Sequence, residues 1–333
     1  MSSPLGIIMA AANSTATQPD PSQDLPFNYI PTGWVGITFL ALFGVTTSAH
    51  LLQAVIFRTW FMIPTLVMCG VGELIGWGAR YWGHVSPTNH DAFLMQICTT
   101  IIAPSFMTAT MFLILPKIIN ELGPQYSRMS PRLYSIIFIT ADVSALVIQA
   151  VGGALASIAD TLEGANQGSH IMLAGIIIQL VAVVLFTLLG IEFVTRYSRN
   201  RPARKVPVSV EQEFQKFSGW DAVSRGVVWM LVGLTIATVF IVIRSVYRTI
   251  ELTDGWNGTI ISTEKWFNWF DGMPIFVAMA VSSVLQHINI DLNLAPIPQT
   301  FNVFHPGYIL RDIGSQLPRS MRPSEEPLEL RTV

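Results

Sequence analysis

The chain has 333 residues, of which 51% are hydrophobic and only 12% are charged. A soluble protein carries about 25% charged residues, so half that share with a positive mean hydropathy points to lipid as the solvent. The formal net charge of −2 provides no basic excess for nucleic acid. Cys69 and Cys98 both lie in apolar runs, where we expect small buried side chains rather than a zinc site or a disulfide framework.

The first 30 residues are polar and rich in Ser, Thr and Pro. Such a composition buries too little apolar surface to offset the entropy of ordering the chain. We therefore expect residues 1–30 to form a disordered extracellular tail. The apolar stretch 5–12 has no basic residue before it, so it makes a poor signal peptide.

Seven stretches are long and apolar enough to cross a membrane, which takes about 20 residues each. Several carry Trp or Tyr near their ends, as residues at a membrane interface do. The sequence thus predicts an all-α membrane protein, a seven-transmembrane helix bundle within residues 31–290. The predicted spans are 33–54, 60–79, 92–116, 133–156, 169–195, 226–247 and 267–288.

The positions of Lys and Arg predict the orientation of the bundle. Fifteen of the 19 basic residues fall in 55–59, 117–132, 196–225 and 289–333, which alternate with the other connecting segments. Basic residues collect on the cytoplasmic side, so we expect the N-terminus outside and residues 291–333 to form a cytoplasmic C-terminal tail. Two glycosylation sequons, at Asn13 and Asn257, fall on the predicted outside.

Polar and charged residues recur inside the predicted spans, where each ionisable group costs roughly 2.5–3.5 kcal/mol and is a functional candidate. Residues seven apart share a helix face, as do residues at offsets 0, 3, 4 and 7. Both spacings occur here, and Gly152 and Gly153 follow one such pair and permit close helix packing. The candidates for substrate binding or translocation are Glu73, Arg80, Asp142, Gln149, Gln179, Arg244, Tyr247, Arg248, Glu251 and Asp271.

The direction of each span places these candidates in depth. Most fall in the outer half of the bundle, and Pro274 is expected to loosen the helix after Asp271. The pattern predicts an outward-facing polar cavity with Glu73 and Asp142 at its floor, where an acid could carry a proton. Alternatively the charges only pair with one another and stabilise the bundle, for example Arg244 with Asp271 or Glu73.

A weaker polar group lies at the inner ends of the first and seventh spans. It consists of His50, Gln53, Gln286 and His287. Side chains near a span end can extend towards the membrane interface. We expect these four to do so rather than to form a site.

At these residues the chain resembles the fungal lipid-translocating exporters, the RTA-like or 7-aminocholesterol-resistance family. The resemblance runs from about residue 30 to 310, and the segment 243–251 followed by Glu264 and Asp271 is its most specific part. Three departures are mild, namely Phe112 for Tyr, Lys117 for Arg and Trp77 for the commoner Tyr. The other matching stretches are 73–80, Ala103-Pro104, 142–149 with Gly152-Gly153, Gly175, Gln179, Gly255, Gly258, Pro274 and His305-Pro306-Gly307.

The resemblance implies a multi-pass plasma-membrane protein that exports or flips sphingoid long-chain bases, or confers resistance to toxic amphiphiles. In some members it implies porphyrin handling. Nine of the ten candidate residues, all but Tyr247, carry over by position. The implied partners are membrane lipids or amphiphilic small molecules, with a homo-oligomer possible, no nucleic acid and no cofactor.

Three classes of function compete. A translocator fits a polar cavity with apolar walls, in which Glu73 or Asp142 would meet an ammonium head; the absence of a nucleotide-binding loop argues against ATP hydrolysis. A seven-helix receptor-like sensor of lipid or small amphiphile fits the helix number but lacks Asp-Arg-Tyr after the third span and Asn-Pro-x-x-Tyr in the seventh. An intramembrane enzyme is disfavoured because the six His are scattered.

Overall fold

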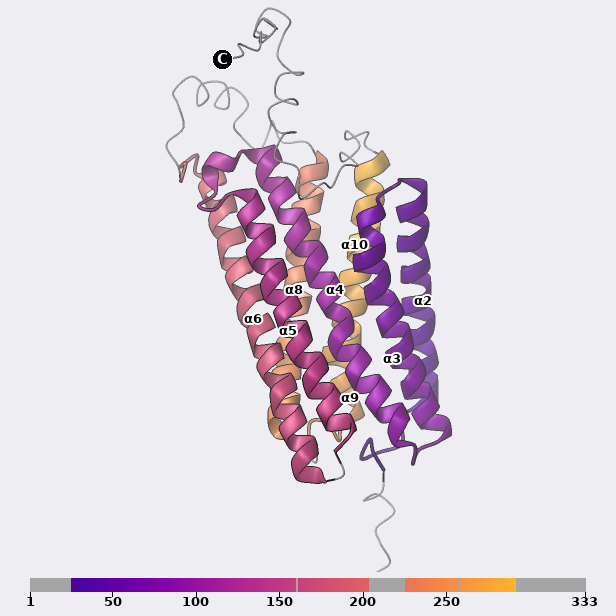
Figure 1. Ribbon diagram of the computed structural model, residues 1–333. Helices are drawn as coiled ribbons and strands as arrows, with labels where there is room; N and C mark the ends of the chain where they lie inside the picture. Colours follow the sequence, from indigo (N-terminus) through magenta and orange to yellow (C-terminus); the bar gives the residue numbers. More distant parts are fainter. Residues whose placement is uncertain (1–24, 160, 204–224, 257, 292–333) are drawn as a thin grey trace, which may run out of the picture. The chain divides into compact units, whose positions relative to one another are not determined.

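The computed structural model describes residues 25–159, 161–203, 225–256 and 258–291. Within those residues all regular structure is helical, and long helices run side by side as one bundle (Figure 1). The long helices are α2 (Gly33–Ile56), α3 (Met68–Val85), α4 (His90–Leu122), α5 (Pro131–Ser157), α6 (Leu162–Ser198), α8 (Arg225–Asp254) and α10 (Met273–Asp291). Short helical turns precede α3 (η1, Trp60–Met62, and η2, Ile63–Val67), α5 (η3, Pro124–Tyr126) and α10 (α9, Glu264–Phe267, and η5, Asn268–Gly272).

Six helical segments of the described chain, from α2 to α8, are long and apolar enough to cross a membrane. They coincide with the first six predicted spans and extend most of them by several residues at one or both ends. The seventh predicted span, 267–288, falls on η5 and α10, and α10 packs against α8 and α2. The multi-pass helical architecture is therefore confirmed, and α10 completes the bundle.

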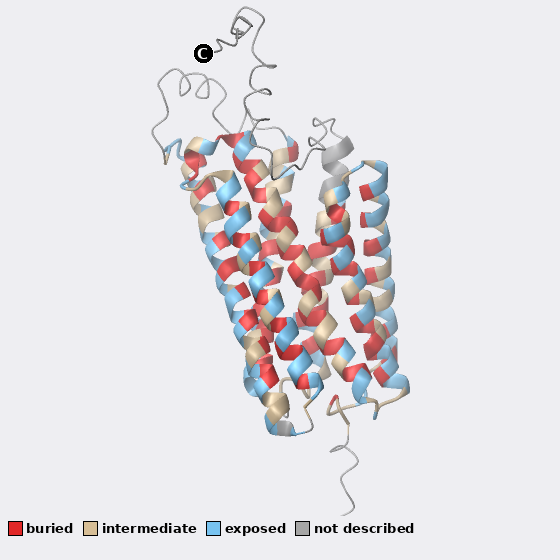
Figure 2. Ribbon diagram, in the orientation of Figure 1, coloured by how far each residue is buried: buried red, intermediate tan, exposed pale blue. Residues whose placement is uncertain are grey.

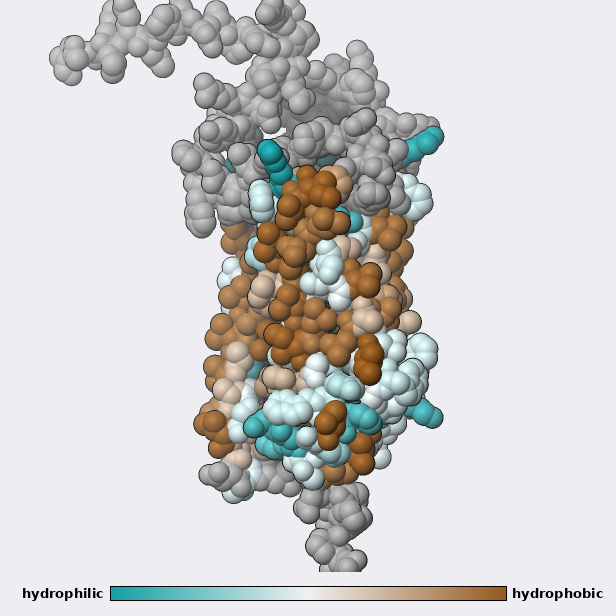
Figure 3. All heavy atoms as spheres, turned by 90° about the vertical axis from the view of Figure 1, so that its right-hand side faces the viewer, coloured by the Kyte–Doolittle hydropathy of each residue, from teal (hydrophilic) through white to brown (hydrophobic). Residues whose placement is uncertain are grey.

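The outside of the bundle is apolar and much of its polar chemistry lies inside. Large hydrophobic side chains such as Val143, Val147 and Leu188 are more than half exposed, and exposed positions line the outward faces of the helices (Figure 2). Figure 3 shows one side of the bundle, whose middle is covered by hydrophobic side chains. An apolar surface of this extent is unfavourable in water and indicates a lipid-facing surface.

Helix α4 passes through the centre of the bundle and contacts α3, α5, α6 and α8. Its start is capped by Asn89, whose side-chain oxygen accepts hydrogen bonds from the backbone N–H groups of Asp91 and Ala92 at 2.9 and 3.3 Å. It continues through Pro104 and Pro116, which neighbouring helices make tolerable in a membrane. This helix supplies residues to both polar clusters described below.

Two helical segments of the bundle contain a π-helical turn, η2 before α3 and η5 before α10. A proline accompanies each of these wide turns. Pro64 lies within η2, and Pro274 lies just after η5. Pro274 has no N–H to donate to the carbonyl of Phe270, so the preceding turn is free to widen. The π-helical turn at Asp271 agrees with the predicted loosening of the helix there, and Asp271 is fully buried.

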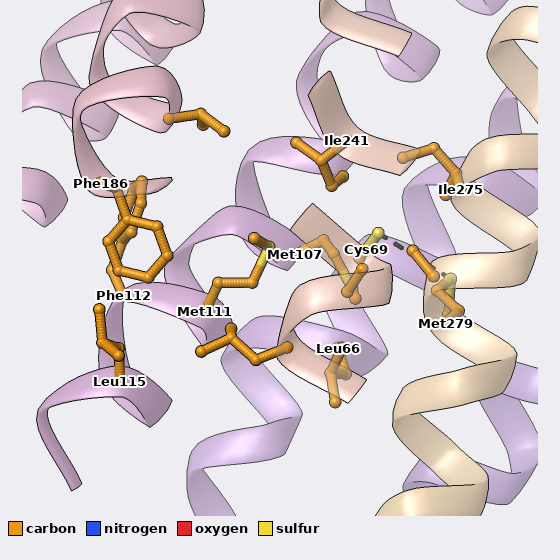
Figure 4. Packing of buried hydrophobic residues seen from close by; sticks show 14 of the residues in the cluster. Leu66, Cys69, Met107, Met111, Phe112, Leu115, Phe186, Ile241, Ile275 and Met279 are labelled. Atoms are coloured by element: carbon orange, nitrogen blue, oxygen red, sulfur yellow. Dashed lines mark hydrogen bonds between the residues drawn. The ribbon is translucent and has the colours of Figure 1, made fainter. Parts of the chain in front are cut away.

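The apolar core is built from Met, Phe, Ile and Leu of several helices (Figure 4). Phe112 of α4 meets Phe186 of α6 edge to face at 4.9 Å between ring centroids. Sγ of Cys69 lies 4.0 Å from Sδ of Met279. Cys69 is buried and Cys98 is half-buried, as expected for small side chains in apolar runs.

The last residues of the predicted tail, which the structure describes from residue 25, pack against the helices. Phe27 is buried against Phe93 at 5.1 Å between centroids, and its ring lies beside Gly83. Tyr29 receives a hydrogen bond from Arg80. Aromatic side chains in an otherwise polar segment provide the apolar area that this docking needs. Residues 1–24, both sequons (Asn13 and Asn257) and the tail from residue 292 lie outside the described residues.

Helices α5 and α6 approach closely at glycines. A Cβ added to Gly152 would stand 2.5 Å from the backbone nitrogen of Met172 and 2.7 Å from the carbonyl oxygen of Gly168. Backbone atoms cannot move aside as a flexible side chain can. The predicted close packing at Gly152 is thus confirmed, as small residues permit in membranes.

We expect Gly152→Ala to destabilise the folded protein by about 1–3 kcal/mol, because the added methyl group overpacks the α5–α6 contact. The matched control is Gly44→Ala, where the nearest atom to an added Cβ is Leu74 Cδ2 at 4.0 Å. Thermal unfolding of purified protein in detergent measures both changes. Equal unfolding temperatures for the two variants would contradict the close approach.

Candidate functional site

The polar stripe predicted on the sixth span is buried as a unit. Arg244, Tyr247, Arg248 and Glu251 of α8 are all at most 7% exposed. Their offsets of 0, 3, 4 and 7 place them on one face, which turns towards α4 and η5. The interior of the bundle therefore contains two guanidinium groups in the C-terminal half of α8.

Arg248 is the centre of a polar cluster that we call the outer cluster, after the side of the membrane on which the sequence predicts it. Its members are Thr100, Arg244, Tyr247, Arg248, Glu251 and Asp271. Its Nε and Nη2 donate to the two carboxylate oxygens of Asp271, both at 2.7 Å, in the bidentate geometry that strengthens such pairs. Its Nη1 donates to Glu251 at 2.7 Å, and Nη2 also donates to the hydroxyl of Thr100 at 2.7 Å. Arg248 thus joins α8, η5 and α4.

Arg244 completes the charge balance of this outer cluster. Its Nε lies 3.0 Å from Oδ1 of Asp271, an ion pair outside hydrogen-bond geometry, and its Nη2 donates to the backbone carbonyl of Thr100. Tyr247 donates its hydroxyl to Glu251 at 2.9 Å. Two arginines face two acids, so the outer cluster is neutral when all four groups are ionised.

A second ion pair lies beside the outer cluster. Nη2 of Arg80 is 3.1 Å from Glu264 and 2.8 Å from the hydroxyl of Tyr29. Glu264 also accepts from the backbone N–H and the hydroxyl of Thr32, at 2.8 and 2.6 Å. Burial raises the pKa of the Tyr29 phenol, which lies outside the helices and stays neutral as it accepts from Arg80. This pair ties the N-terminal segment and α3 to α9.

Glu73 differs from the other acids. It is 1% exposed, and neither of its carboxylate oxygens accepts a hydrogen bond. Its electrostatic neighbours are Arg244, Arg248 and Asp271. The indole of Trp77 is adjacent, but its Nε1 has no acceptor at hydrogen-bond geometry. Glu73 is therefore a buried acid with open acceptor positions beside a charged cluster.

A separate polar cluster, the central cluster, connects α4, α5 and α6. Nε2 of Gln179 donates to Oδ1 of Asp142 at 2.9 Å and to the hydroxyl of Ser105 at 3.0 Å. Nε2 of Gln149 donates to Oε1 of Gln179 at 3.1 Å. The hydroxyl of Thr108 lies 2.8 Å from Oδ2 of Asp142. The predicted common face of Asp142 and Gln149 is confirmed, since both meet Gln179.

The ten predicted residues thus fall into four places: the outer cluster, the Arg80 pair, Glu73 and the central cluster. Arg244 pairs with Asp271, one of the two partners that the sequence allowed. The sequence pattern does not single out Thr100 or Thr108, because hydroxyl groups occur on every face of these helices. Tyr29 gives no signal either, because it precedes α2 in a segment that the sequence predicts to be disordered. Glu264 had a signal, since it is part of the most specific matching segment, but it lies outside the predicted spans.

The expectation that His50 reaches the membrane interface was wrong. Its ring is 0% exposed, and Nε2 lies 3.1 Å from the carbonyl oxygen of Met279. Gln53 likewise donates to the carbonyl of Ser283 at 3.0 Å. Helix α10 packs against α2 and offers carbonyl acceptors there, which sequence spacing cannot reveal. The side chains of Gln286 and His287 lie outside the described residues.

Asp271→Asn should destabilise the protein by about 3–5 kcal/mol, because it leaves the buried guanidinium groups of Arg244 and Arg248 undercompensated. The control is Glu192→Gln, which breaks the more exposed pairs with Arg128 and Arg196 and should cost about 0–1 kcal/mol. The monodisperse fraction that survives heating in detergent measures both. A loss no greater than that of the control would show that the outer cluster is not needed for stability.

The described residues contain no evident metal-binding site. No group of three or more His, Cys, Asp and Glu side chains is positioned there to hold a metal ion. The site chemistry available is therefore that of carboxylates, guanidinium groups, amides and hydroxyls. These groups can bind a cationic or zwitterionic head group or a proton.

Comparison with known proteins agrees with this picture. The sphingoid long-chain base transporter RSB1 of Saccharomyces cerevisiae is 29% identical over 332 residues, covering 94% of this chain and 79% of the relative. Protein RTA1 of the same yeast is 27% identical over 220 residues, covering 66% of this chain and 63% of the relative. The yeast protoporphyrin uptake protein 1 is 25% identical over 223 residues, covering 67% of each.

No solved structure matches the chain significantly. The family model described as RTA1 like protein matches residues 66–290, which contain the outer cluster, Glu73 and the central cluster. The matched segment includes every described long helix except α2. The chain therefore belongs to the RTA1-like protein family.

Proposed function

We propose that this protein translocates lipid-like amphiphiles with a cationic head group across the plasma membrane, and that sphingoid long-chain bases are its substrate class. Membership of the RTA1-like family and similarity over most of the chain to a yeast sphingoid long-chain base transporter support this role. The three relatives compared are not named as receptors, so the receptor-like alternative gains no support. Nothing in their names points to an enzyme.

The proposed topology has seven spans, the N-terminus outside and the C-terminus in the cytoplasm. The packing of α10 against α8 and α2 supports the seventh span. Lys117, Arg196 and Arg225 lie at the helix ends that this topology places inside. The outer cluster then lies in the outer half of the membrane, and glycosylation at Asn13 and Asn257 would fall outside.

The observation that carries the proposed function is the unsatisfied carboxylate of Glu73. Burying an acid that accepts no hydrogen bond costs free energy unless another group donates a hydrogen bond to it. An ammonium head group would supply the hydrogen-bond donors that Glu73 lacks, and its charge would balance a third acid beside the two arginines that already face Asp271 and Glu251. Met107, Met111 and Leu66 of the nearby apolar core are flexible side chains suited to an acyl chain (Figure 4).

Binding at Glu73 requires a second conformation of the bundle. In the described conformation the ten predicted residues are at most 8% exposed, so no polar cavity is open to them. We propose that the outward-facing cavity forms when α3 and α4 separate from α8 and η5 near the Arg80 pair. The remaining predicted residues would then bind the head group or guide it towards water, and membrane lipids would be the partners.

Glu73→Gln should lower translocation on the order of tenfold, since removing one charged hydrogen bond to the substrate corresponds to roughly 1.4 kcal/mol or more. The substitution keeps the shape of the side chain and removes its charge, so the unfolding temperature should stay near that of the wild type. Glu163→Gln, at the exposed start of α6, is the matched control and should transport normally.

The assay uses purified protein in liposomes and a sphingoid base with a labelled head group, scored by an impermeant quencher. Movement above that of protein-free vesicles supports the proposed function. No movement of several amphiphiles by well-folded protein would refute the translocator. Normal movement by Glu73→Gln would refute the role of Glu73 while leaving the translocator standing.

A further inference from the structure

Asp142 is a buried acid that has no cationic partner among the residues that the structure describes. It lies near the middle of α5, a 27-residue helix, and is 4% exposed. Only neutral groups contact its carboxyl, namely the hydroxyl of Thr108 and the amide of Gln179. Asp271 and Glu251, by contrast, each contact a guanidinium group. An acid at this depth must be compensated by a partner or lose its charge.

Within the described part of the chain, no charged group compensates Asp142. Helices α4 and α6 flank α5, and none of their described titratable groups interacts electrostatically with Asp142. Those groups lie towards the helix ends or, for Cys98, against Gly153. On α4 they are His90, Asp91, Cys98, Lys117 and Glu121; on α6, Glu163, His170, Glu192, Arg196 and Tyr197; and on α5 itself, Arg132 and Tyr134.

The hydrogen-bond count of the central cluster favours a protonated carboxyl. Oγ1 of Thr108 lies 2.8 Å from the carbonyl oxygen of Ser105 and 2.8 Å from Oδ2 of Asp142. A hydroxyl has one hydrogen, so it donates to only one of them. When Thr108 donates to Ser105, as hydroxyl groups in helices commonly do, Asp142 must supply the hydrogen between Oδ2 and Oγ1.

The remaining hydrogen bonds of the central cluster also favour a protonated carboxyl at Asp142. Both N–H groups of Gln179 are already used, one on Oδ1 of Asp142 and one on Ser105. Oε1 of Gln149, a residue 1% exposed, is a buried acceptor with no partner. Gln149 lies two turns from Asp142 towards the proposed outer side, so its free acceptor marks a place where a water could pass a proton along.

We propose that Asp142 is a proton-binding site, and that its carboxyl is protonated in the described conformation and donates a hydrogen bond to Thr108. Protonation adds one H⁺ from water and removes the one uncompensated charge of the central cluster. Releasing that proton to water leaves a carboxylate that the closed bundle cannot accommodate. If the protein is a translocator as proposed above, Asp142 is its coupling residue and the proton gradient drives movement.

Infrared spectroscopy of the purified protein in lipid tests the site without any transport assay. At neutral pH the wild type should show a C=O stretching band of a protonated carboxyl group that Asp142→Asn lacks. Asp91→Asn removes the same group from the exposed start of α4 and should leave the band unchanged, because this side chain lies outside the central cluster. Identical spectra for wild type and Asp142→Asn would overturn the proposal.

A second variant keeps the test valid should Asp142→Asn fold poorly. Thr108→Val retains the carboxyl and removes only the hydroxyl that accepts from it. The protonated band should then move to higher frequency, because the O–H of Asp142 has lost its acceptor. An unmoved band would refute the proposed hydrogen bond.

Sodium titration separates a proton from a metal cation at the same oxygen atoms. Unfolding temperatures at neutral pH should be equal in sodium chloride and in choline chloride of the same concentration. Stabilisation by sodium that Asp142→Asn abolishes would assign a metal cation instead. Protein that moves no lipid but shows the Asp142 band would refute the proposed function and leave the proton site intact.

Discussion

The pairing of Arg248 with Asp271 is the contact on which the outer cluster and the packing of α8 against η5 depend. It joins α8 to the π-helical turn before α10 through two hydrogen bonds, and Thr100 brings α4 to the same guanidinium group. In lipid, water is not available to replace a lost partner, so the pair is costly to separate. The positions of Arg244, Glu251 and Tyr247 follow from it, because they share its face of α8.

The two polar clusters solve the same physical problem in different ways. The outer cluster neutralises its acids with arginines, so it holds helices together and resists opening. The central cluster contains an acid among amides and hydroxyls, where a proton can provide the neutrality that no arginine supplies. Glu73 belongs to neither arrangement, since it is near the arginines but accepts no hydrogen bond. A protein that only needed stability would have little use for such an acid.

The segment that matches the family model contains positions where packing or burial demands a particular residue type. The matched segment holds Gly152 where α5 meets α6, the π-helical turn at Asp271 and the buried stripe of α8. Each requires particular residue types, because backbone contact needs glycine and a buried arginine needs an acid. These requirements explain why the most specific matching segment contains Arg244, Arg248 and Asp271.

Much of this architecture could be predicted from the sequence, because lipid imposes simple rules on it. Apolar stretches of sufficient length placed six helices within several residues, and helical spacing grouped Asp142 with Gln149 and Arg244 with Arg248 on their faces. Tertiary structure alone decided which groups meet across helices: Asp271 rather than Glu73 for Arg244, Gln179 for Asp142, and the carbonyl of Met279 for His50. The physical reason is that helical periodicity specifies the direction in which a side chain points around the axis of its own helix. Its partner on another helix depends on how far the two helices are shifted along, and rotated against, each other.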